Sequence, residues 1–135
     1  LLHRVRKAGV QQLPYTTESF HIVIAHGVLH NTNRYEKFVQ GIKEIARVLK
    51  NGGFLCINVF YYKTHNPSIK MSKKNKHVFY TDIGLPMVLL PKDEIVNILA
   101  KHDLLPCQTP ATYTSVVSTG MRDVFRGVFI KKSSR

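Results

Sequence analysis

A small group of residues suited to chemistry follows the apolar run Ile22–Ala25. His26 and Gly27 come directly after this run, and His30 lies just beyond them. Because an imidazole titrates near neutral pH, His30 could line a reaction cavity or take a proton from a substrate. A glycine at position 27 lets a ligand come close to the backbone. The structural alternative, which we favour over proton transfer, is that His30 caps the following turn or packs beside Tyr35.

The other nucleophilic and metal-ligating side chains do not form a catalytic or metal-binding pattern. The serines lack a G-x-S-x-G setting, which argues against hydrolase chemistry. Cys56 and Cys107 have no CxxC spacing, so reduced structural thiols are expected. The spacing of four histidines does not suit a metal ion: His3, His65, His77 and His102. We therefore expect no metal site.

A predicted strand and helix position the first group. The run Ile22–Ala25 is too short for a helix and is bounded by polar residues, which is typical of a strand buried on both faces. Asn33 and Glu36 have the spacing of a capping box, which predicts the start of a helix. Apolar residues at three- and four-residue steps predict the face of this helix that packs on a sheet: Tyr35, Phe38, Ile42, Ile45, Ala46 and Leu49.

A second predicted strand completes a βαβ unit. The sequence Asn-Gly-Gly at 51–53 tolerates positive φ and should stop the helix, and the apolar run Phe54–Phe60 follows it. Such crossovers are almost always right-handed, and in an open sheet ligands bind beyond the carboxyl ends of the strands. The candidate site therefore includes His26–Asn33 and Tyr61–His65.

The segment 61–90 is predicted to be a long basic loop, followed by a helix. It contains the basic run Lys70–His77, KMSKKNKH, between two pairs of aromatic residues. A loop of this length is usually functional or disordered, so the run is either a substrate-covering loop or a solvated charge run, and we favour the latter slightly. Pro91 suits the first position of the next helix, which should end near Asp103.

Two antiparallel strands are predicted at the end of the chain. Thr112–Ser118 is rich in threonine and valine, and Val124–Lys131 has alternating character. The residues Gly120–Asp123 between them are expected to form the turn of a terminal hairpin.

Composition is consistent with one domain, residues 1–135, and one hydrophobic core. The net charge of +12 favours acidic partners, which include nucleic acid, anionic lipid and acidic small molecules. A basic but functionally silent surface is an equally good explanation. No apolar run approaches the roughly 18 residues of a spanning helix, and no signal peptide is recognisable, so we expect a cytoplasmic protein with no membrane partner.

Three stretches of the sequence resemble a known enzyme family. The string LPYTTESFHIVIAHGVLHNT is followed by EIARVLKNGG and then by FLCINVF. Their order and spacing, over Leu13–Phe60, resemble the central part of a class I S-adenosylmethionine-dependent methyltransferase of the type 11 kind. Within this pattern, His21 and Asn51 replace the usual aspartate and proline.

The resemblance implies an α/β, Rossmann-like sheet and S-adenosylmethionine as cofactor. Strand three would lie within 1–12, and strands four to seven would follow, ending in the terminal antiparallel hairpin. Gly9 stands where the family usually has an acidic or hydroxyl residue. The resemblance implies the following sites: cofactor contacts at Gly9, Val10, Gln11, Ala25, His26 and Gly27, and substrate contacts at Tyr61 and Tyr62, with the 61–90 loop as a lid.

The glycine-rich turn that the resemblance calls for is not found in this sequence. No G-x-G-x-x-G or G-x-G-x-G occurs, so strands one and two of the family's sheet, order 3-2-1-4-5-7-6, are expected to be missing. Strand four would then have a bare apolar edge. We interpret the chain as the carboxyl-terminal part of a longer methyltransferase, produced by truncation, a partial gene model or a split protein.

Three functions remain open on the sequence alone. The first is a methyltransferase fragment that acts on an unidentified acceptor, for which the net charge favours an anion. Whether this fragment is active in isolation is left open by the sequence. The second is a non-catalytic module that associates with itself or with a second chain through the strand-four edge. The third and weakest is a basic RNA-binding domain that uses the lysines of the charge run, Lys70, Lys73, Lys74 and Lys76.

Overall fold

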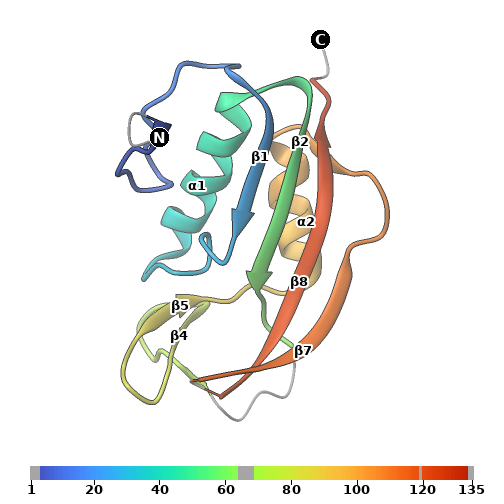
Figure 1. Cartoon of the computed structure of the whole chain (residues 1–135). Coiled ribbons are helices and arrows are strands. Elements are labelled where there is room, and N and C mark those ends of the chain that lie inside the picture. Colours follow the sequence, from blue (N-terminus) through green and yellow to red (C-terminus); the bar gives the residue numbers. More distant parts are fainter. Residues whose placement is uncertain (1–3, 64–68, 119, 134–135) are drawn as a thin grey trace.

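The computed structural model describes residues 4–63, 69–118 and 120–133, and its centre is a mixed five-stranded sheet (Figure 1). The strands occur in the order β1-β2-β8-β6, and β7 also pairs with β8. Their bounds are β1 Phe20–His26, β2 Leu49–Phe60, β6 Leu104–Pro106, β7 Ala111–Val117 and β8 Gly120–Lys131. β1 and β2 are parallel, whereas β8 is antiparallel to each of its neighbours. The predicted βαβ unit and terminal antiparallel hairpin are therefore confirmed.

Both helices pack on one face of this sheet. They are α1, Tyr35–Val48, and α2, Lys92–Lys101. The side chains of the sheet that share the core with them are Leu55, Ile57, Val59, Phe125 and Phe129. The predicted apolar face of α1 is largely confirmed, because Phe38, Ile42, Ile45 and Ala46 are buried.

The opposite face of the sheet is open, which corrects the expectation that the first strand is buried on both faces. Ile22 and Ile24 of β1 are 57% and 68% exposed, and Phe54 of β2 is 40% exposed. Among the described residues β1 pairs only with β2, so its other edge is bare as expected. The sequence pattern was apolar on both sides of β1, but the two helices of the described residues cover only one side.

The segment predicted as a long loop instead contains a second, three-stranded sheet. Its strands are β3 Lys70–Met71, β4 Val78–Tyr80 and β5 Pro86–Val88, in that order. Phe79, Met87 and Leu89 form a separate buried cluster against which Phe60 and Tyr62 pack. This small sheet lies at the end of the molecule toward which β1 and β2 point (Figure 1).

Several predicted boundaries were wrong. Arg34, not Asn33, is the residue before α1, and no side chain caps the helix, so the capping box does not form. The helix ends at Val48, and Leu49 already belongs to β2, whereas Gly52 does have the expected positive φ of 83°.

Three further predictions, for the turn of the terminal hairpin, the start of α2 and the amino-terminal strand, were also wrong. The residues Gly120–Asp123 belong to β8 and are not the predicted turn, since their register continues the pairing with β7. Pro91 precedes α2 instead of occupying its first position. Strand three does not form within the described part of 1–12, residues 4–12.

Among the described residues, no helix has both the length and the apolar character needed to cross a membrane.

Candidate functional site

The carboxyl end of β1 presents accessible backbone. Gly27 has a φ of 65°, and no atom lies within 4 Å of the place where a side-chain β-carbon would stand. Its N–H donates to the Asn58 carbonyl at 2.8 Å, and its own carbonyl accepts from Asn31 Nδ2 at 2.6 Å. Ala25 is buried and His26 is exposed. The loop is therefore held from one side and open to a ligand on the other.

The residues predicted to contact the cofactor near the amino end, Gly9–Gln11, form a turn that lies against α1. The Gln12 N–H donates to the Gly9 carbonyl at 3.1 Å, and Gln40 Nε2 of α1 donates to the Gln11 carbonyl at 3.3 Å. Val10 packs against the main core. The turn is therefore attached to the middle of α1.

Gly41 of α1 brings the two groups of predicted cofactor residues together. A β-carbon at position 41 would lie 2.6 Å from Leu29 Cδ2 and 3.2 Å from Val10 Cγ1. Leu29 follows the His26 and Gly27 loop, so both candidate segments contact the same small helical residue. Sequence reasoning missed Gly41, although a glycine within a predicted helix is the signal of such a close approach.

Glu44 and Arg47 hold the segment that leads into β1. Their side chains form an ion pair at 2.6 Å between Arg47 Nε and Glu44 Oε2. Arg47 also donates to the carbonyls of Leu13, at 3.1 Å, and Tyr15, at 2.9 Å. The hydrogen bond from Arg47 is the main cause that lowers the pKa of Glu44. Two of the motifs that carry the family resemblance, LPY and EIARVL, are thus joined directly by hydrogen bonds.

His30 is a buried structural residue at the junction of the two sheets. It is 2% exposed, its Nδ1 accepts the Phe60 N–H at 3.0 Å, and its ring stacks on the Phe60 ring at 4.3 Å. Its carbonyl accepts the Val88 N–H. Burial, and secondarily the charge of Arg122, lower the pKa of His30 to about 4. With Nδ1 engaged as an acceptor, the neutral ring carries its proton on Nε2. This geometry fits a positioning role.

The two tyrosines predicted as substrate contacts have different environments. Tyr61 is 7% exposed, belongs to the main core and contacts Phe125 edge to face. Tyr62 is half-buried and stacks on Phe79 at 5.1 Å between ring centroids. The structure therefore places Tyr61 away from solvent, and of the two only Tyr62 is partly accessible.

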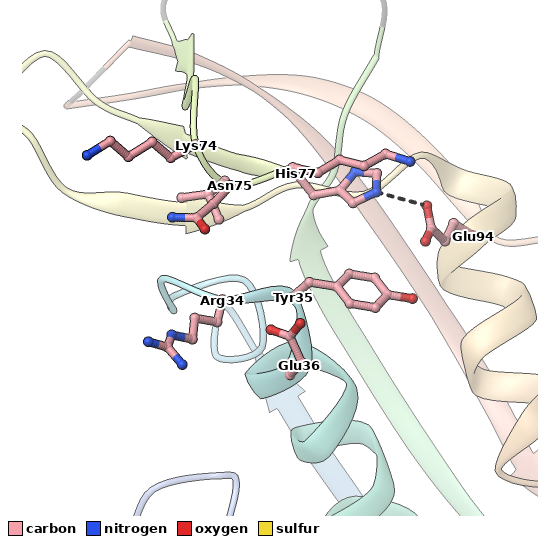
Figure 2. A pocket seen from close by; sticks show the side chains of 9 residues that line it. Arg34, Tyr35, Glu36, Lys74, Asn75, His77 and Glu94 are labelled. Carbon is pink, nitrogen blue, oxygen red and sulfur yellow. Dashed lines mark ion pairs between the residues drawn. The ribbon is translucent and has the colours of Figure 1, made fainter.

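A polar pocket lies between the start of α1, the turn before β4 and α2. Its volume is about 660 Å³. Figure 2 shows the residues that line it. Arg34 comes directly before α1, and Tyr35 and Glu36 belong to the first turn of α1. Lys74, Asn75 and His77 come from the turn, and Glu94 comes from α2. His77 Nε2 and Glu94 Oε2 are 3.7 Å apart, and the His77 ring lies 5.7 Å from that of Tyr35. Part of the basic run is thus fixed against both helices, which the sequence did not predict.

No cluster of side chains suited to a metal ion occurs among residues 4–63, 69–118 and 120–133.

Comparison with known proteins agrees with this architecture. Residues 2–57 match the family described as "Methyltransferase domain". The human protein described as "Probable tRNA methyltransferase 9B" is 35% identical over 74 residues, which are 55% of this chain but 14% of the human protein. The chain thus matches a small part of the length of that relative.

Solved methyltransferase structures share the fold. A methyltransferase of Methanosarcina mazei superposes with a TM-score of 0.72 at 16% identity, over 93% of this chain and 65% of that protein. The 1,6-didemethyltoxoflavin-N1-methyltransferase of Burkholderia thailandensis, solved with S-adenosylhomocysteine, superposes with a TM-score of 0.63 at 14% identity, over 92% of this chain and 48% of that protein. The family match thus covers residues 2–57, and the fold of the chain is the one found in these solved methyltransferases.

Proposed function

We propose that this chain takes part in methyl transfer from S-adenosylmethionine to an acceptor bound near the carboxyl ends of β1 and β2. The observation that carries the proposal is the open backbone of Gly27, which directly follows β1. The sheet to which β1 belongs has the strand order expected from the methyltransferase resemblance. A bound cofactor would supply an activated methyl group. Ala25, His26 and Gly27 would hold its methionine part.

The turn Gly9–Gln11 would contact the adenine of the cofactor. Its attachment to α1 through Gln40, and the shared contact at Gly41, support this assignment because they keep the turn near the β1 loop. His30 would position the β1 loop against Phe60 and leave proton transfer to another group, since its ring is buried and its Nδ1 already accepts the Phe60 N–H.

We also propose that a further strand completes the sheet along the bare edge of β1. The support is that Ile22 and Ile24 are exposed and that β1 pairs on one side only among the described residues. In a methyltransferase this position belongs to the strand that precedes the glycine-rich turn. That strand could come from a longer form of this chain or from a second polypeptide.

The cofactor assignment is tested by titrating the ¹⁵N-labelled chain with S-adenosylhomocysteine. We expect the shifted amide signals to be those of Gly9–Gln11 and Ala25–Gly27, and Gly27→Ala should reduce them. Gly84→Ala is a matched control, because Gly84 also has a positive φ, 81°, and open space around it. Signals that shift elsewhere, or equal effects of the two variants, would contradict the assignment. Micromolar affinity would show that the glycine-rich half is not required.

A non-catalytic association module is the second candidate, and the open apolar face favours it. Light scattering on the purified chain would show a dimer or larger species, and Ile24→Lys should convert it to a monomer. Val116→Lys on β7 is the control, since Val116 is 80% exposed and lies away from the β1 edge. A well-folded monomer of the unmodified chain would count against this candidate.

RNA as the acceptor or ligand is favoured by the name of the human relative and by the basic run. We expect RNA affinity to fall steeply with salt if Lys70, Lys73, Lys74 and Lys76 contact phosphates. Changing these four lysines to glutamine should weaken binding and reduce the salt dependence. The same change at four exposed helical lysines, Lys37, Lys43, Lys92 and Lys101, is the control with equal charge loss. Equal weakening by both sets would remove this candidate.

A further inference from the structure

The open face of the sheet carries one polar row beside two apolar rows. The strand register aligns Ile22, Phe54 and Ile130 in one row, and Ile24, Cys56 and Val128 in the next. The third row, at the carboxyl end of β1, consists of His26, Asn58 and Arg126. Polar side chains that share a row on an otherwise apolar face need a reason, because apolar residues there would pack equally well against any covering element.

A pocket of about 330 Å³ lies at this row. It forms because the chain between β6 and β7 leaves the edge of β8 after the Cys107 N–H donates to the Val128 carbonyl at 2.9 Å. Gln108 and Thr109 line the resulting gap on one side. His26, Cys56 and Arg126 line it from the sheet.

The polar groups of the row are oriented by one another. The Arg126 guanidinium lies over the Tyr113 ring, with Cζ 5.8 Å from the centroid. Asn58 Nδ2 lies 3.5 Å from the Tyr113 hydroxyl. The guanidinium therefore rests on Tyr113, and among the described residues no carboxylate forms an ion pair with it, so its N–H groups remain able to donate to a ligand.

The charge at this pocket is of one sign. No carboxylate lines it, and no carboxylate of the described residues forms an ion pair with Arg126. The pocket of Figure 2 differs, because Glu36 and Glu94 offset its cations. Arginine with an unused planar edge matches the geometry of a carboxylate or phosphate.

We infer that the pocket at this row binds the oxyanion of the methyl acceptor, with Arg126 as its main cation and Gln108 as a further donor. The inference rests on the proposed function, because the row adjoins Gly27, where the cofactor would end. Arg126 would thereby select acceptors that carry a carboxylate or a phosphate close to the methylated atom.

The test is a titration of the ¹⁵N-labelled chain with inorganic phosphate and, separately, with acetate, followed at the side-chain signals of Arg126 and Gln108. We expect these signals to shift, and Arg126→Gln to weaken the binding about tenfold. Arg126→Lys should restore only part of the affinity, since lysine lacks the planar edge. Arg34→Gln in the other pocket is the control. The two ions distinguish a phosphate acceptor from a carboxylate acceptor.

The inference is overturned if Arg126→Gln binds both ions as the unmodified chain does, or if the shifts centre on Arg34 and Lys74. The S-adenosylhomocysteine titration is independent of it. Anion binding at Arg126 without any response to S-adenosylhomocysteine would contradict the proposed function alone, whereas the reverse result would contradict the acceptor site alone.

Discussion

The carboxylate of Glu44 accepts the backbone N–H of Leu13 at 3.0 Å, across a sequence separation of 31 residues. Through this bond, α1 holds the segment that enters β1. Arg47 completes the attachment by donating to two carbonyls of the same segment. The last turns of α1 therefore set the entry to β1, which ends at His26 just before Gly27. A substitution at Glu44 or Arg47 should thus alter the position of the β1 loop.

Glu44→Gln should lower the free energy of unfolding by about 2 kcal/mol, since a partly buried N–H loses its charged acceptor. The difference from the unmodified chain should be present above pH 4.5 and disappear as the pH falls, because the pKa of Glu44 is lowered in the folded chain. Urea unfolding measures it. Glu36→Gln, on the exposed first turn of α1, is the control, and an equal loss there would argue against the specific bond.

Lys131→Met should destabilise the chain by about 1 kcal/mol, because Lys131 Nζ caps the carboxyl end of α1. It donates to the carbonyls of Ala46, at 2.7 Å, and Leu49, at 2.8 Å. Lys132→Met removes the same charge from the exposed neighbouring position. Thermal or urea unfolding of both variants separates capping from net charge, and similar values would show that Lys131 contributes no cap.

Gly41→Ala tests the close contact between α1 and the two candidate cofactor segments. Alanine favours the helix by about 1 kcal/mol, but crowding the buried side chain of Leu29 costs about 1–3 kcal/mol, so we expect a net loss of stability. Amide signals of Val10 and Gly27 should shift as well. Lys37→Ala is the exposed helical control. A stabilised variant with unchanged signals would show that the contact is loose.

His30 should make stability depend on pH between 6.5 and about 4. The folded chain keeps this ring neutral, while the unfolded chain binds a proton below pH 6.5, so acid favours unfolding. The free energy of unfolding should fall by about 1.4 kcal/mol per pH unit in this window. His30→Asn, which keeps an acceptor for the Phe60 N–H but does not titrate, should show a shallower slope in urea unfolding. Parallel slopes would contradict the lowered pKa.

The sequence determined the local elements of the fold. The spacing of Phe38, Ile42 and Ile45 predicted the buried face of α1, and the run Phe54–Phe60 predicted the strand beside it. The motifs LPY and EIARVL lie within residues 2–57, which match the methyltransferase family that they resemble. These signals are readable because helix and strand periodicity depend on neighbours within a few residues.

The sequence-based predictions failed where contacts between distant segments override the local conformational preference. The capping box at Asn33 was a good local solution, yet the helix begins without a side-chain cap. The basic loop proved to contain a small sheet because Phe79 and Met87 find apolar partners at the end of β2. Tyr61 looked available to a substrate but packs against Phe125.

The sequence by itself thus determined the periodic elements, their order and the family that residues 2–57 match. Only the tertiary structure decided that Gly41 lies against both Leu29 and Val10, that the described residues leave one face of the sheet uncovered, and that Arg126 aligns with His26 and Asn58. The physical reason is that strand register and helix packing are set by contacts between residues far apart in the chain, and no local pattern records which of these distant residues meet.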